Sequence, residues 1–149
     1  NVGWSEVQIA HQPVLAGVKH LNRLEQVLAR AALAGTDDVE ALMCDADQRV
    51  ICGTMSNVFI VNGQCLRTPR LDRAGVAGIM RHVLRRESAA LGLDFEEAEL
   101  DRADVAAAEE IFLTNVRIGV WPVRRLEGQA RAVGTVTRRV QTHLAGLDR

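Results

Sequence analysis

The sequence lacks long hydrophobic runs, an excess of charge of either sign, internal repeats and low-complexity segments. No apolar run is long enough to span a bilayer, and the first residues carry no signal-peptide pattern. The 18 basic and 19 acidic residues are mixed along the chain and leave a net charge of −1, which favours neither a nucleic-acid nor a membrane-surface partner. With 149 residues and 48% apolar content, we expect one globular domain with a substantial core.

Cysteine is scarce too, and its three residues are Cys44, Cys52 and Cys65. Their number is odd, no two form a Cys-x-x-Cys pair, and none stands at a ligand-like spacing from the four histidines. We therefore expect reduced thiols in a cytoplasmic protein, with no structural metal and no metal at the functional site.

Hydrophobic periodicity and turn signals alternate along the chain. They predict helices at residues 23–34, 79–91, 101–107 and 133–144. They predict strands at residues 4–10, 39–45, 50–52, 57–61, 64–68, 93–100, 110–115 and 120–126. Asn62-Gly63 indicates a tight hairpin. Because strands outnumber helices and the two are interspersed, we expect an α+β fold or a barrel-like α/β arrangement, with a mixed sheet and flanking helices.

Lys19 stands just ahead of the first predicted helix. Asn22 is a good N-cap and Glu25 can reach back to it, so the helix should begin at about residue 23. An apolar stripe should bury one helix face, and it consists of Leu24, Val27, Leu28 and Ala31. The positive end of this helix would favour a neutral, nucleophilic amine on Lys19. Without further information, however, a lysine in this place is most often a solvated surface charge.

Gly75 and Gly78 precede the second long helix. Glycines let the backbone approach a ligand closely, and the N–H groups of Gly78, Ile79 and Met80 would lie at a helix start, where an anion is favoured. Taken alone, two glycines before a helix are more often an ordinary turn.

Six segments in order resemble the fold-type IV pyridoxal-phosphate (PLP) enzymes, the class IV aminotransferases. Residues 19–28 resemble the lysine segment of the aminodeoxychorismate lyase branch of this family. The other matching segments are residues 53–59, 68–69, 75–81, 108–115 and 122–123. The resemblance covers residues 13–123 and extends more loosely beyond them. It implies that residues 1–14 end a linker, that residues 15–149 form a C-terminal PLP-binding domain, and that the family's N-terminal domain is absent from these 149 residues.

The same resemblance implies the site residues. Lys19 would anchor PLP through a Schiff base and then move a proton. Gly78, Ile79 and Met80 would form the phosphate cup, and Val76 would lie against the pyridine ring, unless it is an ordinary core valine. Thr114 and Asn115 end a strand where the family contributes polar contacts near the phosphate, although Thr-Asn also opens turns. His20 and Arg23 are either substrate-side or structural.

Cys52 departs from the family pattern. A glutamate normally stands five residues before the asparagine that matches Asn57, and its carboxylate keeps the pyridine nitrogen protonated. A thiol is a weak hydrogen-bond partner with little negative charge at neutral pH, so the electron sink should be weaker. Cys52 could equally be a small buried apolar residue.

The resemblance implies a homodimeric lyase that acts on the small molecule aminodeoxychorismate. It would eliminate pyruvate and leave p-aminobenzoate, a step of folate synthesis. Two alternatives stay open, which are a class IV aminotransferase of the D-amino-acid or branched-chain type and a non-catalytic fragment or degenerate member. An isolated chain without the N-terminal domain should have little or no activity.

Overall fold

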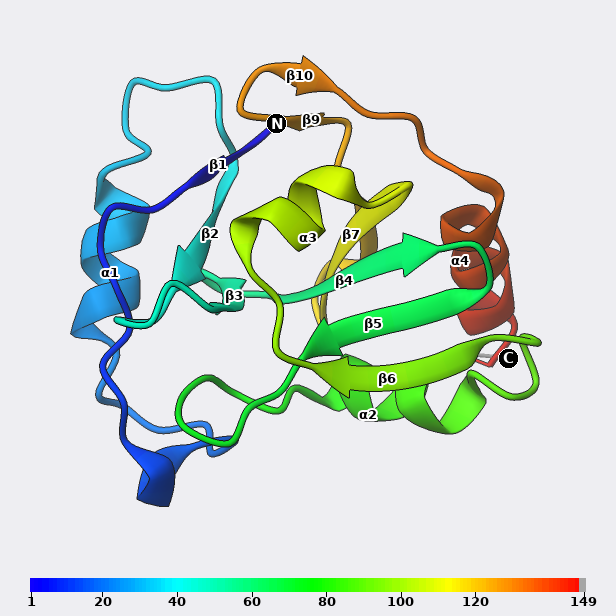
Figure 1. The fold of residues 1–149 in the computed structure, drawn as a ribbon, viewed down its shortest axis with the longest axis horizontal. Coiled ribbons are helices and arrows are strands. Elements are labelled where there is room, and N and C mark those ends of the chain that lie inside the picture. The colour runs from blue at the N-terminus through cyan, green and yellow to red at the C-terminus, as the bar shows by residue number, and fades with distance from the viewer. Residues whose placement is uncertain (148–149) are drawn as a thin grey trace.

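The protein folds into two five-stranded sheets with helices on their outer faces, in a computed structural model that describes residues 1–147 (Figure 1). In spatial order, the first sheet consists of β10 (Gln129–Ala130), β9 (Arg125–Leu126), β1 (Val2–Trp4), β2 (Glu40–Cys44) and β3 (Val50–Gly53). The second consists of β6 (Asp94–Ala98), β5 (Cys65–Pro69), β4 (Asn57–Asn62), β7 (Glu110–Asn115) and β8 (Gly119–Pro122). Both sheets mix parallel and antiparallel pairs, which confirms the expected α+β fold with mixed sheets and flanking helices.

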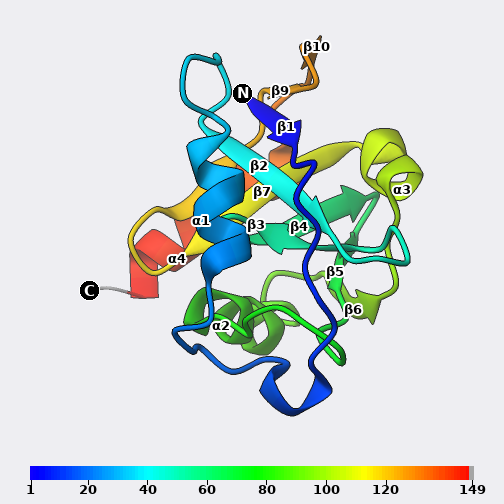
Figure 2. The same cartoon turned by 90° about the vertical axis from the view of Figure 1, so that its left-hand side faces the viewer.

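Three of the four α-helices within residues 1–147 lie on the outer faces of the two sheets, as the two perpendicular views show (Figures 1 and 2). Helix α1 (Leu24–Ala31) packs on the first sheet, while α2 (Ile79–Glu87) and α4 (Thr135–Leu147) pack on the second. The short α3 (Arg102–Ala107) contributes Val105 to the core between the sheets. No helix within residues 1–147 combines the length and the apolar character needed to cross a membrane.

The core between the sheets is built from the inward-facing residues of both. Leu42 and Val50 of the first sheet meet Val58, Ile60 and Leu113 of the second. The outer face of the second sheet has its own core, to which α4 contributes Val136, Val140 and Leu144, the apolar side that the sequence predicts. Strands β4 and β7 are both buried on their two faces. Their sequences are therefore continuous apolar runs.

Two hairpins connect neighbouring strands, and the one at Asn62-Gly63 forms as predicted. Asn62 pairs with Cys65 across a turn in which Gly63 has a φ of +59°, so β4 and β5 are joined by the Asn-Gly turn. Strands β2 and β3 form the second hairpin, and the chain then passes through residues 54–56 into β4. This passage carries the chain from β3, an edge strand of the first sheet, to β4, the central strand of the second, through a tight turn.

The predicted strand at residues 4–10 is wrong in its extent, because β1 ends at Trp4. The Ser5 hydroxyl donates to the carbonyl of Val7 and accepts from its N–H, each at 3.0 Å. This local turn competes with the backbone hydrogen bonds that would extend β1. Beyond it, this segment makes only an isolated β-bridge, from Ile9 to Asp45.

The start and the buried face of α1 also differ from the prediction. The N-cap residue is Arg23, without a side-chain cap, and the Glu25 carboxylate accepts from the Ala10 N–H at 3.0 Å instead of reaching back to Asn22. Ala29 alone is buried in this helix, because its small side chain seats the helix on the first sheet. Leu24, Val27 and Leu28 are 68%, 58% and 52% exposed, so the predicted apolar stripe faces outward.

Candidate active site

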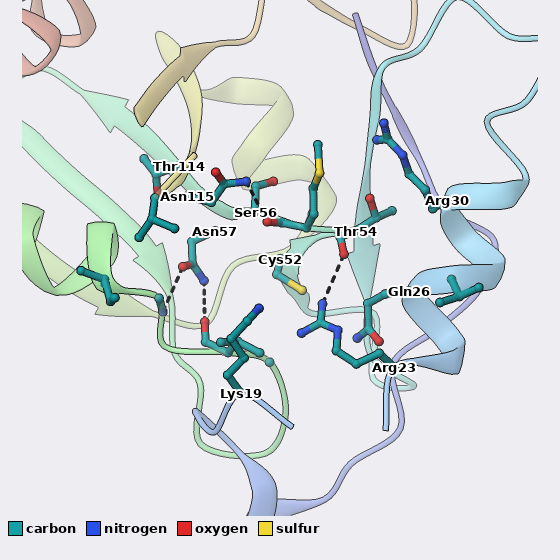
Figure 3. Close-up of a pocket in the computed structure, with 18 residues that line it drawn as sticks. Lys19, Arg23, Gln26, Arg30, Cys52, Thr54, Ser56, Asn57, Thr114 and Asn115 are labelled. Carbon is teal, nitrogen blue, oxygen red and sulfur yellow. Dashed lines mark hydrogen bonds between the residues drawn. The ribbon is translucent and has the colours of Figure 1, made fainter. Parts of the chain in front are cut away.

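A cavity of about 520 Å³ opens between α1, the turn before α2 and the ends of β3, β4 and β7 (Figure 3). Seven of the eight residues that the resemblance assigns to the site line it, and these are Lys19, Cys52, Val76, Gly78, Ile79, Thr114 and Asn115. The eighth, Met80, is directed into the core under the second sheet, so only its backbone could serve the site. Segments far apart in the sequence therefore meet at one place, as a shared site requires.

Lys19 is the only lysine of the 149 residues, and its backbone segment is fixed to the turn before α2. The Gly17 N–H donates to the Gly75 carbonyl at 2.9 Å, and the Ala77 N–H donates to the Gly17 carbonyl at 3.0 Å. Gly17 and Gly75 have φ values of +81° and +90°, which a residue with a Cβ rarely adopts. Figure 3 shows the Lys19 side chain pointing into the cavity, toward Asn57 and Cys52.

The N-terminus of α2 forms one end of the cavity. Gly78 is its N-cap residue, and no side chain within residues 1–147 caps the helix. Its own N–H donates to Asn57 Oδ1 at 3.2 Å, while Asn57 Nδ2 donates to the Val76 carbonyl at 2.7 Å. The sequence predicted that the Gly78 N–H would be free to bind an anion, but this N–H is already bound to Asn57. The N–H groups of Ile79 and Met80, at the first two helical positions, have no acceptor within the helix and remain for an anion.

Position 78 requires glycine for a steric reason. A Cβ there would lie 2.5 Å from Asn57 Oδ1, the atom that ties β4 to this turn. Any larger residue would push Asn57 aside and disturb the start of α2.

Thr114 carries an unpartnered buried hydroxyl at the cavity wall. The residue is fully buried, and among residues 1–147 its Oγ1 has no hydrogen-bond partner. Asn115, in contrast, uses its side chain locally, since Nδ2 donates to the Met55 carbonyl at 3.1 Å and Oδ1 accepts from the N–H groups of Arg117 and Ile118. Of the Thr-Asn pair, Thr114 therefore offers the group that a ligand could satisfy.

Cys52 lies on the cavity wall in β3 and is 6% exposed. Burial raises the pKa of its thiol to about 12, although the nearby Arg23 guanidinium acts in the opposite direction. The thiol is therefore neutral at physiological pH. Arg23, which the sequence left undecided, lines the same cavity and donates to the Thr54 carbonyl at 3.3 Å. His20 lines a neighbouring cavity instead.

The turn at residues 54–56 is held by a carboxylate that sequence reasoning missed. Glu40 is fully buried, and it accepts hydrogen bonds from the N–H groups of Thr54 and Met55 and from the hydroxyls of Thr54 and Ser56. A charged residue inside a predicted buried strand was the available signal, because such a carboxylate needs several donors. Glu40 thereby fixes one wall of the cavity.

A second group of polar side chains lies outside the cavity. His11, Asp45 and Asp47 bring their ligand-type atoms within 4.8 Å of one another. Each carboxylate already has a cationic neighbour, since Arg49 binds Asp45 at 2.9 Å and Arg73 binds Asp47 at 2.9 Å. We interpret this group as an ion-pair network.

Comparison with known proteins places this geometry in a family. The family model described as amino-transferase class IV matches residues 2–126. The aminodeoxychorismate lyase of Vibrio harveyi is 35% identical over 147 residues, which cover 96% of this chain and 54% of that enzyme.

Solved structures agree with the sequence match. The crystal structure of 4-amino-4-deoxychorismate lyase from Pseudomonas aeruginosa gives a TM-score of 0.93 at 41% identity and covers 97% of this chain and 54% of that one. The branched-chain aminotransferase of Thermobaculum terrenum, in its PLP form, gives 0.89 at 26% identity and covers 98% and 50%. The chain spans about half the length of these relatives. The family model covers most of the chain, and the chain belongs to the class IV aminotransferase family.

Proposed function

We propose that this chain is the C-terminal, cofactor-binding domain of a PLP-dependent lyase that releases pyruvate from aminodeoxychorismate and leaves p-aminobenzoate. The observation that carries the proposal is the attachment of the Lys19 segment to the glycine turn before α2, which puts the only lysine and an anion-binding helix start in one cavity. The lyases of Vibrio harveyi and Pseudomonas aeruginosa, at 35% and 41% identity, support the choice of reaction.

The residues present fit a bound PLP. Its phosphate would be held by the N–H groups of Ile79 and Met80 and by the Thr114 hydroxyl, which otherwise stays unsatisfied. Val76 and Cys52 line the space where the ring would lie, and Lys19 would bind its aldehyde carbon. When bound, PLP supplies an electron-withdrawing ring conjugated to the substrate's amine-bearing carbon.

The chain's own contribution to the reaction centres on Lys19 Nζ. Once released from the cofactor, Nζ would be free to take the proton from the amine-bearing carbon of the substrate. It points into the cavity, whose lining includes Cys52 of β3 and Asn57 of β4. One side chain thus both anchors the cofactor and moves the proton.

We further propose that the remainder of the site comes from an N-terminal domain, with residues 1–14 as the end of a linker and residues 15–149 as the domain described here, in a homodimer. Several large apolar side chains of α1 and of the segment before it support a covered surface, and these are Val14, Val18, Leu21, Leu24, Val27 and Leu28, all exposed in this chain. We expect the domain alone to have little or no lyase activity. Its cytoplasmic location stays a prediction from the cysteine content.

Product analysis tests the reaction. A protein containing both halves, supplied with PLP and aminodeoxychorismate, should release pyruvate and p-aminobenzoate in equal amounts. An aminotransferase, the second candidate, would instead form a keto acid from an amino-acid donor, and its support is the family membership shared with the branched-chain enzyme. Formation of a keto acid without p-aminobenzoate would contradict the lyase proposal.

Thr114→Val should weaken PLP binding by about 10- to 100-fold, because a hydrogen bond to a charged group contributes about 1.5 to 3 kcal/mol. Fluorescence titration of the apoprotein with PLP measures the dissociation constant. Thr68→Val is the matched control, since Thr68 is a buried threonine outside the cavity whose hydroxyl donates to the Val58 carbonyl at 2.8 Å. The control should lose stability and keep its PLP affinity. Equal affinities of Thr114→Val and wild type would remove Thr114 from the phosphate site.

A further inference from the structure

The cavity is cationic and holds no acidic side chain. Among the described residues that line it, Lys19, Arg23 and Arg30 are basic, and none is aspartate or glutamate. The Arg23 guanidinium projects from the start of α1 toward Cys52 and Thr54 (Figure 3). A base placed in such surroundings gains a proton less readily, because nearby positive charge disfavours its protonated form.

Two carboxylates lie close enough to act on Cys52 electrostatically, but each is committed elsewhere. Glu40 is fully buried behind the turn at residues 54–56, where its oxygens accept from that turn. Glu25 accepts from the Ala10 N–H, and both residues line the neighbouring cavity. Neither lines the cavity, so neither is available to hold a protonated ring nitrogen.

The ring nitrogen of PLP stands opposite the carbon that bears the aldehyde, and it therefore points away from the group that Lys19 binds. Enzymes set the protonation of this atom with a carboxylate or a guanidinium partner. In this chain the buried wall offers the Cys52 thiol, a weak donor and weak acceptor, with the Arg23 guanidinium beside it.

Resting on the proposed function, we propose that this site holds the ring nitrogen of PLP without a proton, with Cys52 and Arg23 in the place of a carboxylate. A neutral ring withdraws electrons more weakly than a protonated one. It therefore disfavours aminotransfer, in which the ring must hold the electron pair until a proton returns to the cofactor's own carbon. Elimination places a lower demand on the ring, because the electron pair leaves with the enol oxygen as the carbon–oxygen bond breaks and the substrate ring becomes aromatic. The released enolpyruvate then takes up a proton from water and becomes pyruvate.

The test is the ¹⁵N NMR shift of the ring nitrogen in holoprotein loaded with ¹⁵N-labelled PLP at neutral pH. Wild type should give the shift of an unprotonated pyridine. Cys52→Glu should raise the protonated-to-neutral ratio by at least about tenfold, because an opposite charge at close range moves a pKa by one to three units. Cys52→Ser, a neutral variant of similar size, should keep the wild-type shift, and Cys52→Asp serves if the glutamate variant does not fold.

A protonated nitrogen in wild type would overturn this inference and leave the lyase proposal standing. Failure of PLP to bind at Lys19 would overturn both, and reductive trapping reports that separately. As a second readout, Cys52→Glu should form pyridoxamine phosphate from an amino-acid donor at least about tenfold faster than wild type. An unchanged rate in a variant whose ring nitrogen is protonated would contradict the link to reaction choice.

Discussion

Replacing Lys19 by alanine should lower the rate of pyruvate release by at least about 10³-fold, because a positioned acid–base group alone contributes about 10²- to 10⁴-fold. The variant also loses the covalent anchor of the cofactor. The fold should tolerate the change, since the Lys19 side chain is exposed and the segment is fixed by backbone hydrogen bonds of Gly17. Steady-state assays of pyruvate release measure the loss.

Lys19→Arg separates chemistry from charge. It keeps the positive charge in the cavity, but a guanidinium neither forms an imine nor gives up a proton at neutral pH. Lys19→Arg should therefore be as inactive as Lys19→Ala. Arg86→Ala is the matched control, because this exposed side chain of α2 bonds only to neighbouring Glu87 among the described residues. Activity within tenfold of wild type in Lys19→Ala would show that the amine does not carry the reaction.

Gly134→Ala should lower the free energy of unfolding by about 2 to 4 kcal/mol, the combined cost of overpacking and a lost helix cap. The Glu110 carboxylate reaches from β7 to the start of α4, where it accepts from the N–H groups of Val136 at 3.1 Å and Thr137 at 2.7 Å. A Cβ at position 134 would occupy the place of this buried carboxylate. Both the cap and the side chain would have to move.

Thermal and denaturant unfolding measure this effect, and a fall in Tm of about 5 to 15 °C is expected. Gly146→Ala lies on the same helix with open space around its Cβ, so it should leave stability unchanged or raise it by up to about 1 kcal/mol. Equal stabilities of the two variants would show that Glu110 does not hold the start of α4.

Local signals in the sequence are sufficient for most elements and for much of the site. The Asn62-Gly63 hairpin and the apolar side of α4 follow from turn chemistry and helical spacing alone. The resemblance predicted that Lys19 and the glycine turn before α2 belong to one site. Periodicity could not predict this, because it does not report contacts between distant segments.

The sequence could not predict the long-range contacts of polar groups. Glu25 fits a capping box with Asn22, yet the Ala10 N–H, which is distant in sequence, takes its carboxylate. Glu40 and Glu110 look like unfavourable charges in strands until their donors from other elements are seen. The outward stripe of α1 has the spacing of a buried face, and spacing does not say which surface covers it.

The most direct measurement is borohydride reduction of the protein with PLP, followed by peptide mapping. The account predicts one reduced cofactor adduct within these 149 residues, on the peptide that contains Lys19. An active protein in which that peptide stays unmodified would contradict the account, because the cavity beside α2 would then not be where the cofactor is held.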